Sequence, residues 1–355
     1  MLNGRTEQAV AEWESIVRLL PADYDLRVRL ATTQLKLGRN ATALEHLLEA
    51  SRLRPLSPEL TELLARGLMS RQRYPEALEI YWKIYQERPH HPDLAEALPE
   101  LALQVPAAPE VRLAAARMAE GRQRLDQAAE ILEETVRRYP DQAEARVMLA
   151  GLYLQRGDAQ EAERILSAEG GAELSDLRRL RILAEAQTRQ GKREETAATL
   201  ARIAKLAPED QETQRRLAFL LNDLERHEEA APLLQALLAK DGGDRELLFR
   251  LARSEFALGK FEPGKGRLAR LLELAPEHEG GLALLIDRQL KEQRWKEAAP
   301  LLERWVAKHA DDSTARYNLI TAYLRQFNKG AARPHYEALT ALNPVQARQL
   351  APYFR

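Results

Sequence analysis

The stretch that decides the fold lies at residues 143–162 and reads AEARVMLAGLYLQRGDAQEA. Two segments of good helix-forming residues flank Gly157, and each carries a small residue, Ala150 in the first and Ala162 in the second. Small side chains let two helices approach closely, while larger neighbours such as Leu149 fill the remaining volume. The stretch therefore predicts a pair of helices joined by a tight turn.

The pair recurs along the chain with a fixed period. Seven prolines are separated by 34, 34, 51, 68, 68 and 68 residues, and every interval is a multiple of 17. A 34-residue period is the length of a helix-turn-helix repeat, so the 51-residue gap contains one additional half unit. The prolines on this spacing are Pro21, Pro55, Pro89, Pro140, Pro208, Pro276 and Pro344.

Placing this proline at position 32 of each repeat sets the register of the packing residues. Position 8 is Ala31, Ala65, Ala116, Ala150, Ala184, Ala218, Ala252, Ile286 and Ile320. Position 20 is Ala9, Ala43, Ala77, Ala128, Ala162, Thr196, Ala230, Gly264, Ala298 and Ala332. The turn between the two helices carries Gly38, Gly157, Gly191 and Gly259.

This pattern resembles the tetratricopeptide repeat (TPR) family, which has small residues at positions 8 and 20, a turn glycine and a terminal proline. The family's Tyr at position 11 survives as Tyr153 and Tyr323, and its Trp at position 4 is missing. The resemblance implies an all-α fold, a right-handed α-solenoid superhelix of stacked antiparallel helix pairs. Position 4 holds Arg27, Thr61, Arg112, Arg146, Leu180, Gln214, Leu248, Leu282 and Arg316.

The register predicts one solenoid over residues 1–355, with no internal domain boundary. Residues 1–23 form a half repeat with a second helix only, and 24–91 form two repeats. An irregular half unit at 92–108 precedes seven repeats over 109–346, and 347–355 begin a truncated capping helix. The pairs Gly170-Gly171, Gly242-Gly243 and Gly280-Gly281 are assigned to turns between repeats.

The half unit at 92–108 contains Pro99 and Pro106, and proline does not fit comfortably inside a helix. We therefore expect a break there. It is either a tolerated insertion or a hinge between a short N-terminal arm and the seven-repeat body.

Composition excludes several classes of protein. The formal net charge is -1, so no global attraction favours nucleic acid. No cysteine is present, which excludes disulfides and thiolate metal sites. No run of 18 or more apolar residues occurs, so no membrane insertion is expected. We expect a cytoplasmic protein as the chain stands, or a periplasmic one if it is a fragment of an exported protein.

Two stretches imitate chemical motifs. Residues 259–266, GKFEPGKG, approach the phosphate-binding G-x-x-x-x-G-K-[ST], but Gly266 replaces the hydroxyl residue and the stretch follows a helix. The adjacent His90 and His91 lack carboxylates at ligand spacing. No serine lies in a nucleophile motif. The sequence therefore predicts no catalytic residue, no metal and no cofactor.

The surface is the remaining source of function. In the family that this chain resembles, the first helices line a concave groove that binds extended peptides or partner helices. The guanidinium groups of arginines and the phenylalanine rings on this face suit an acidic partner segment with hydrophobic anchors. The alternative is a lattice of ion pairs with Glu185, Glu212, Asp223, Glu246 and Glu255. The predicted groove residues are Arg178, Arg181, Arg215, Arg216, Phe219, Asn222, Phe249, Arg250, Arg253 and Phe256, with Arg189 beside them.

The first half repeat leaves Ala9 and Trp13 without the helix that would cover them, and we assign them to a terminal interface. Three interpretations of this half repeat stay open. The chain is a piece of a longer protein, the half repeat docks a partner or a second copy, or it acts as a short cap.

The leading hypothesis is a noncatalytic adaptor, bacterial in type, that binds a segment of another protein. One alternative is the scaffold region of a larger bacterial envelope or exopolysaccharide-export protein. Another is self-assembly into homo-oligomers through the open ends. An enzyme with a site at the bend would need clustered titratable groups, which residues 92–108 do not supply.

Overall fold

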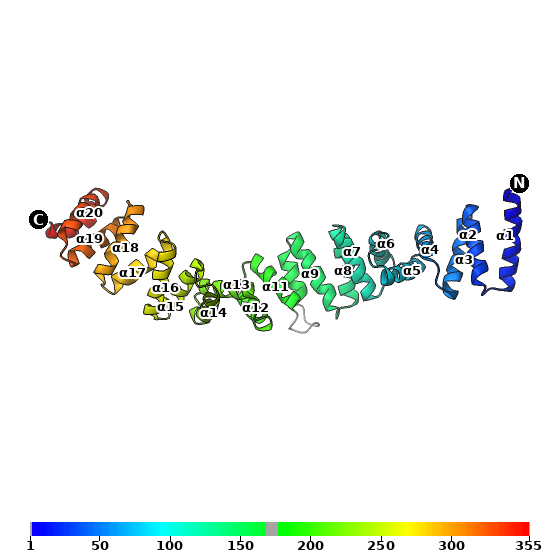
Figure 1. Cartoon of the computed structure of the whole chain (residues 1–355), viewed down its shortest axis with the longest axis horizontal. Coiled ribbons are helices and arrows are strands. Elements are labelled where there is room, and N and C mark those ends of the chain that lie inside the picture. The colour runs from blue at the N-terminus through cyan, green and yellow to red at the C-terminus, as the bar shows by residue number, and fades with distance from the viewer. Residues whose placement is uncertain (1, 168–176, 355) are drawn as a thin grey trace. The chain divides into compact units, whose positions relative to one another are not determined.

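The computed structural model describes residues 2–167 and 177–354, and every regular element in these two ranges is a helix. The chain divides into two compact units, Met1–Gln190 and Gly191–Arg355. Within each unit, consecutive helices run antiparallel and pack on their neighbours in the sequence (Figure 1). The predicted all-α solenoid of helix pairs is confirmed. Gly170-Gly171 lies outside the described residues.

The helices of the first unit alternate between first and second helices of the repeats, with α6 as the additional one. They are α1 (Leu2–Leu19), α2 (Tyr24–Lys36), α3 (Asn40–Leu53), α4 (Pro58–Ser70), α5 (Tyr74–Glu87), α6 (Leu94–Gln104), α7 (Pro109–Gly121), α8 (Leu125–Arg138), α9 (Ala143–Arg156), α10 (Ala159–Ser167) and α11 (Leu177–Arg189).

The second unit continues the alternation and ends in a short 3₁₀ helix. Its helices are α12 (Arg193–Leu206), α13 (Gln211–Asp223), α14 (His227–Lys240), α15 (Arg245–Ala257), α16 (Phe261–Leu274), α17 (Glu279–Lys291), α18 (Trp295–Lys308), α19 (Ser313–Arg325), α20 (Lys329–Leu342), α21 (Pro344–Leu350) and η1 (Ala351–Tyr353).

The small residues predicted to lie between helices are buried as expected. Ala150 on α9 and Ala162 on α10 are fully inaccessible, and so are the corresponding alanines of most other repeats. Leucines one position before most of these residues of the first helices, such as Leu149, fill the space around them, whereas Ala116 follows Ala115. Burial of this alanine and leucine seam stabilises each pair, because an isolated helix of 13 or 14 residues is marginal in water.

The turn inside each repeat has a left-handed residue at position 15. The predicted glycines occupy it with φ of 72° at Gly38, 89° at Gly157, 72° at Gly191 and 73° at Gly259. The other repeats place a residue with a side chain there. Those residues are Gln72, Gln123, Glu225, Gln293 and Phe327, with φ between 55° and 61°.

Of the two prolines in the half unit, Pro99 does not break the helix, and the helix ends just before Pro106. Pro99 lies inside α6, which runs unbroken from Leu94 to Gln104, whereas Pro106 lies after its end. As the sixth residue of α6, Pro99 removes one backbone hydrogen bond, the bond to the carbonyl of Ala95. Leu94, Leu98 and Leu101 are fully buried against the neighbouring helices, and this burial outweighs the lost bond.

The predicted turn at Gly280-Gly281 is wrong, whereas Gly242-Gly243 does lie in a turn. Gly280 and Gly281 are the second and third residues of α17, whose first turn is capped by His278. A Cβ atom at Gly280 would lie 2.9 Å from the Phe249 ring. The glycines therefore allow close packing at this helix start rather than unusual backbone angles.

Candidate functional site

Eight of the ten predicted groove residues lie in the second unit, on α13 and α15, which contact each other directly. Arg215 and Phe219 are one helical turn apart on α13, and Arg250 reaches them from α15. The guanidinium carbon lies 4.9 Å from the Phe219 ring centre for Arg215 and 4.3 Å for Arg250. We call these three residues the Arg–Phe–Arg cluster, in which two cations contact one aromatic ring.

Arg215 is held by the residue that caps the next first helix. Asp244 accepts hydrogen bonds from the backbone amides of Glu246 and Leu247, at 2.9 and 3.0 Å, and from Nη1 of Arg215 at 2.7 Å. Burial by itself raises the pKa of Asp244, but the Arg215 and backbone hydrogen bonds outweigh it and the pKa is lowered. Asp244 therefore stays ionised and fixes both α15 and the arginine.

Arg250 is the most buried arginine of the cluster, with 19% of its side chain exposed. Its Nη1 donates to Asp223 at 2.6 Å, and its Nε donates to Glu246 one turn away on α15. Desolvation lowers its pKa, yet the two carboxylates outweigh burial and the pKa is raised. Arg253 lies 4.0 Å from the same Asp223 carboxylate. The predicted alternative, a lattice of ion pairs, is thus present on this face.

Asn222 was placed on the groove by its repeat position, and this part of the prediction is wrong. Its side chain is fully buried, and its Nδ2 donates to the hydroxyl of Ser254 at 2.7 Å and to the carbonyl of Arg250 at 3.0 Å. Nδ1 of His227 lies 3.2 Å from the same hydroxyl. The pKa of His227 is lowered, mainly by burial and to a smaller extent by the positive charge of Arg253. Ser254 is fully buried, so this network joins α13, α14 and α15 internally.

The remaining phenylalanines of the face are half-buried and packed by rings. Phe249 contacts His278, with ring centres 5.0 Å apart, and Phe256 contacts Phe261 at 6.3 Å. A Cβ atom at Gly264 would lie 2.3 Å from the Phe256 ring. The small residue predicted at position 20 therefore makes room for this phenylalanine.

The other predicted arginines are exposed. Arg216 extends from α13, and Arg178 and Arg181 extend from α11, which belongs to the first unit. The structure therefore brings Arg215, Arg250 and Arg253 together with Phe219, while Arg178 and Arg181 lie on a separate unit. Position counting missed Asp244, although an aspartate directly before a predicted helix is a recognisable cap.

The two imitated motifs have structural roles. Lys265 is almost fully buried, and its ammonium donates to Glu262 at 2.8 Å and to Glu292 at 2.5 Å, so neighbouring carboxylates already neutralise it. His91 places Nε2 3.0 Å from Glu62 and accepts from the amide of Asp93. In the described ranges, no group of three or more metal-binding side chains gathers.

The predicted terminal residues lie on α1. Ala9 and Trp13 are half-buried, and Trp13 packs against Val10, Val17 and Leu30. No helix among the described residues combines the length and the apolar character needed to cross a membrane.

Comparison with known proteins identifies the class. Two family models described as tetratricopeptide repeat match the chain, one at residues 28–92 and 283–347 and the other at 118–168 and 221–285. Together these matches cover more than half of the chain, which belongs to the tetratricopeptide repeat family. Such repeats form scaffolds for protein interaction. Among curated proteins, none matches this chain.

Solved structures with similar helices include YrrB, described as a TPR protein with an unusual peptide-binding site. It shares 16% identity and covers 54% of this chain and 98% of its own, with a TM-score of 0.44. A structure of MamA shares 13% identity over 48% of this chain and 92% of its own, with a TM-score of 0.38. MamA from Desulfovibrio magneticus RS-1 shares 18% identity and covers 58% of this chain and 97% of its own, with a TM-score of 0.32.

Proposed function

We propose that this TPR protein is a noncatalytic adaptor that binds an acidic segment of a partner protein, with hydrophobic anchors, on the face of α13 and α15. The Arg–Phe–Arg cluster carries the proposal. It combines apolar ring area with two guanidinium groups fixed by Asp244, Asp223 and Glu246. A surface held in place before binding loses little conformational freedom when a partner arrives.

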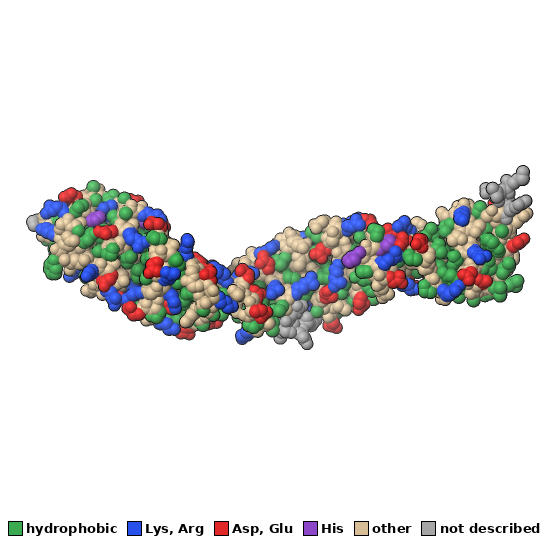
Figure 2. Space-filling model, in the orientation of Figure 1, with side chains coloured by type: hydrophobic (Ala, Val, Ile, Leu, Met, Phe, Trp, Pro, Cys, Tyr) green, Lys and Arg blue, Asp and Glu red, His purple; other side chains and the backbone are tan. Residues whose placement is uncertain are grey.

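The ion pairs on this face are compatible with binding. Each guanidinium has five N–H donors, and the hydrogen bond from Arg215 to Asp244 uses one nitrogen while 36% of the Arg215 side chain stays exposed. Exposed ion pairs contribute only about 0 to 1 kcal/mol each, so partner carboxylates can add to the lattice or exchange with its members. Figure 2 shows acidic and basic side chains mixed over the visible face, which favours a local acidic contact over a broad one.

The test is capture of a biotinylated peptide of alternating glutamate and leucine residues by the full chain. Arg216→Glu combined with Arg253→Glu should reduce capture at least roughly tenfold, because an exposed and a half-buried positive charge of this face become repulsive to an acidic segment. Arg245→Glu changes an exposed arginine at the start of the same helix α15, off the face, and serves as the matched control. Unchanged capture by the double variant, with native helicity, would remove this face as the site.

A second candidate is self-assembly through the end of α1, where Leu19 is 81% exposed and Leu20, directly after the helix, is 55% exposed. Hydrophobic side chains also gather over α1 to α3 on the face in Figure 2. Light scattering over a concentration series distinguishes the candidates, because mass should rise with concentration and Leu19→Glu should abolish the rise. The role as a scaffold region of a larger bacterial envelope or export protein stays a prediction.

A further inference from the structure

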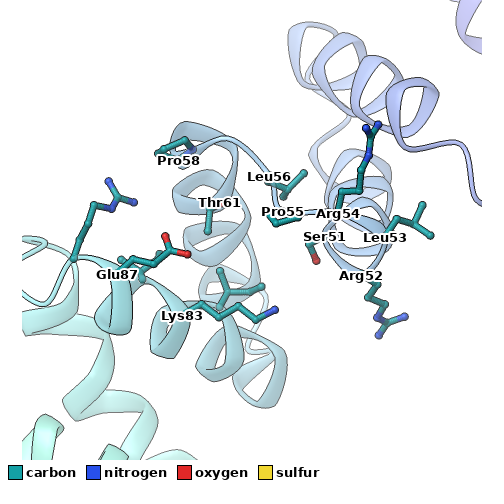
Figure 3. Close-up of a pocket in the computed structure, with 13 residues that line it drawn as sticks. Ser51, Arg52, Leu53, Arg54, Pro55, Leu56, Pro58, Thr61, Lys83 and Glu87 are labelled. Atoms are coloured by element: carbon teal, nitrogen blue, oxygen red, sulfur yellow. The ribbon is translucent and has the colours of Figure 1, made fainter.

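A pocket of about 290 Å³ opens in the first unit between α3, α4 and α5. Figure 3 shows Lys83 and Glu87 of α5 on one side, the end of α3 with Ser51 and Arg52 on the other, and Thr61 of α4 between them. None of these residues belongs to the α13 and α15 face. The pocket is therefore a separate feature of the surface.

The pocket exists because of the residue at position 4 of this repeat. Thr61 is the smallest of the nine residues at that position, where other repeats place long side chains. Arg112, Arg146 and Arg316 occupy position 4 of α7, α9 and α19, and their side chains are only 1%, 7% and 9% exposed. A long side chain at position 4 is thus normally folded into the space between neighbouring repeats. In α4, threonine leaves that space open.

The charge at position 26, which faces position 4, also differs between this repeat and that of α7 and α8. In the repeat of α7 and α8, Arg112 lies 3.5 Å from Glu134, which holds position 26. In the repeat of α4 and α5, position 26 is Lys83, and no described carboxylate lies within ion-pair distance of its ammonium. The open space beside Thr61 therefore has a cation, Lys83, at the position where the filled space beside Arg112 has an anion, Glu134.

The rest of the lining has the same character. Of the thirteen described residues around the pocket, four are cations, and Glu87 is the one acid. Asp25, Glu49 and Glu62 pair with Arg54, Arg52 and Arg88 from outside the pocket, which leaves the exposed Lys83 as the lining cation outside these ion pairs. Anionic groups of a ligand complement this rim.

The lining of the pocket is mixed, and its apolar part includes residues of α4, α5 and the segment before α4. Ile80 and Ile84 of α5 are 4% and 1% exposed, and Leu56 packs beside them. Pockets for whole small-molecule ligands start near about 300 Å³, so this one suits a single large side chain. Filling it would remove apolar surface from water at roughly 25 cal/mol per Å².

We propose that this pocket binds one bulky apolar side chain of an acidic segment of a partner protein, inserted where a longer position 4 residue would lie. Carboxylates on either side of that side chain contact Lys83 and the neighbouring arginines. The site is independent of the α13 and α15 face, and either proposal stands if the other fails.

The probe is the synthetic peptide acetyl-Asp-Glu-Trp-Glu-Asp-amide, titrated into the full chain carrying isotope-labelled isoleucine methyl groups. We expect saturable shifts of the Ile80 and Ile84 methyl signals. Replacing tryptophan by alanine in the peptide, or its acids by lysine, should weaken binding at least roughly tenfold. Because Ile80 and Ile84 lie in the first unit, binding to α13 and α15 does not produce these shifts.

Two variants test the occupancy of the pocket. Thr61→Trp fills it from inside and should abolish the shifts while leaving the urea midpoint of unfolding unchanged or higher. Thr42→Trp places the same ring on an exposed threonine of α3 and should bind like the wild type. If Thr61→Trp does not fold, Lys83→Glu, which alters only an exposed side chain, should weaken binding roughly fivefold or more.

The proposal is overturned if the peptide leaves Ile80 and Ile84 unchanged, or if the folded Thr61→Trp variant binds it as the wild type does. In the event of a folding failure, wild-type affinity of Lys83→Glu overturns it instead. Sedimentation velocity without peptide supplies a further check. A dimer that Thr61→Trp abolishes would show that a second copy occupies the pocket, which also overturns the proposal.

Discussion

At the scale of single residues, position 15 shows how one backbone angle is tolerated in different ways. Nine repeats need a left-handed residue there, and only four supply glycine. For residues with a Cβ atom, this conformation costs roughly 1 to 2 kcal/mol. Phe327 is the extreme case, because it combines φ of 60° with a side chain that is 96% exposed and gains little from packing.

Phe327→Gly should therefore raise the free energy of unfolding by about 1 kcal/mol, since relief of the strained angle exceeds the entropy that glycine adds to the unfolded chain. The measurement is urea unfolding followed by circular dichroism. Gly259→Ala is the reciprocal control at the same position and should destabilise by a similar amount. A decrease in stability for Phe327→Gly would mean that its ring makes a contact that stabilises the fold.

Glu255 illustrates a single buried charge. Its side chain is 6% exposed, and burial raises its pKa, although Arg267 and Lys260 act in the opposite direction. A carboxyl group with a raised folded pKa binds protons more tightly in the folded state. Its contribution to stability is therefore present below the unfolded pKa, near 4.5, and is lost as the pH rises through the folded pKa.

Glu255→Gln removes that ionisation. The stability of the variant relative to the wild type should increase as the pH rises from about 4.5 towards neutrality. Urea unfolding at a series of pH values measures this difference. Glu273→Gln, at a carboxylate that is 66% exposed, controls for the loss of a surface charge. A constant difference between Glu255→Gln and the wild type would contradict the prediction.

At the scale of helices, α16 contains two glycines with opposite roles. Glycine in a helix interior is less favourable than alanine by about 1 kcal/mol. A Cβ atom at Gly266 meets nothing within 4 Å, whereas one at Gly264 lies 2.3 Å from the Phe256 ring and 3.3 Å from the Ala252 carbonyl. Packing against α15 therefore determines that glycine is required at position 264 and is replaceable at position 266.

Gly266→Ala should stabilise the protein by about 1 kcal/mol, and Gly264→Ala should destabilise it by roughly 1 to 3 kcal/mol through overpacking. Thermal unfolding of the two variants, two residues apart in one helix, measures the contrast. Equal effects of the two variants on stability would show that the Phe256 ring can move away from the added methyl group at no cost in free energy. Since Phe256 belongs to the proposed face, Gly264→Ala should also perturb peptide capture there.

Four helices contain a proline inside them without being interrupted by it. Pro99, Pro232, Pro300 and Pro334 all occupy the sixth residue of their helices. At that place, proline removes a single bond near the helix start, and the buried faces hold the helix together. The rule that proline ends a helix failed at Pro99 because it considers the local backbone and ignores the tertiary packing.

At the scale of the whole molecule, solenoid stability is a sum of contacts between neighbouring elements. In the second unit, each helix from α12 to α21 packs on the next one in the sequence. A piece of such an array keeps most of its contacts when it is separated from the rest.

The fragment 191–355, expressed alone, should therefore remain helical and unfold cooperatively, since it retains the internal contacts of the second unit. Far-UV circular dichroism and urea unfolding measure this outcome. Replacement of the buried Leu251 by aspartate provides the negative control, because an unpaired charge in the core should unfold the fragment. A disordered spectrum for the parent fragment would mean that the second unit depends on the first.

The sequence alone determined the helical repeat, its register and the alanine seam. These features depend on a spacing and a pattern of side-chain sizes that repeat every 34 residues. Only the tertiary structure decided which polar residues are accessible. Asn222 has the correct repeat position for a groove, yet it is buried, and its Nδ2 donates to Ser254 and to the Arg250 carbonyl of the next repeat. The pocket beside Thr61 likewise depends on side chains from three helices, and contacts between distant residues are not encoded in the period of any one segment.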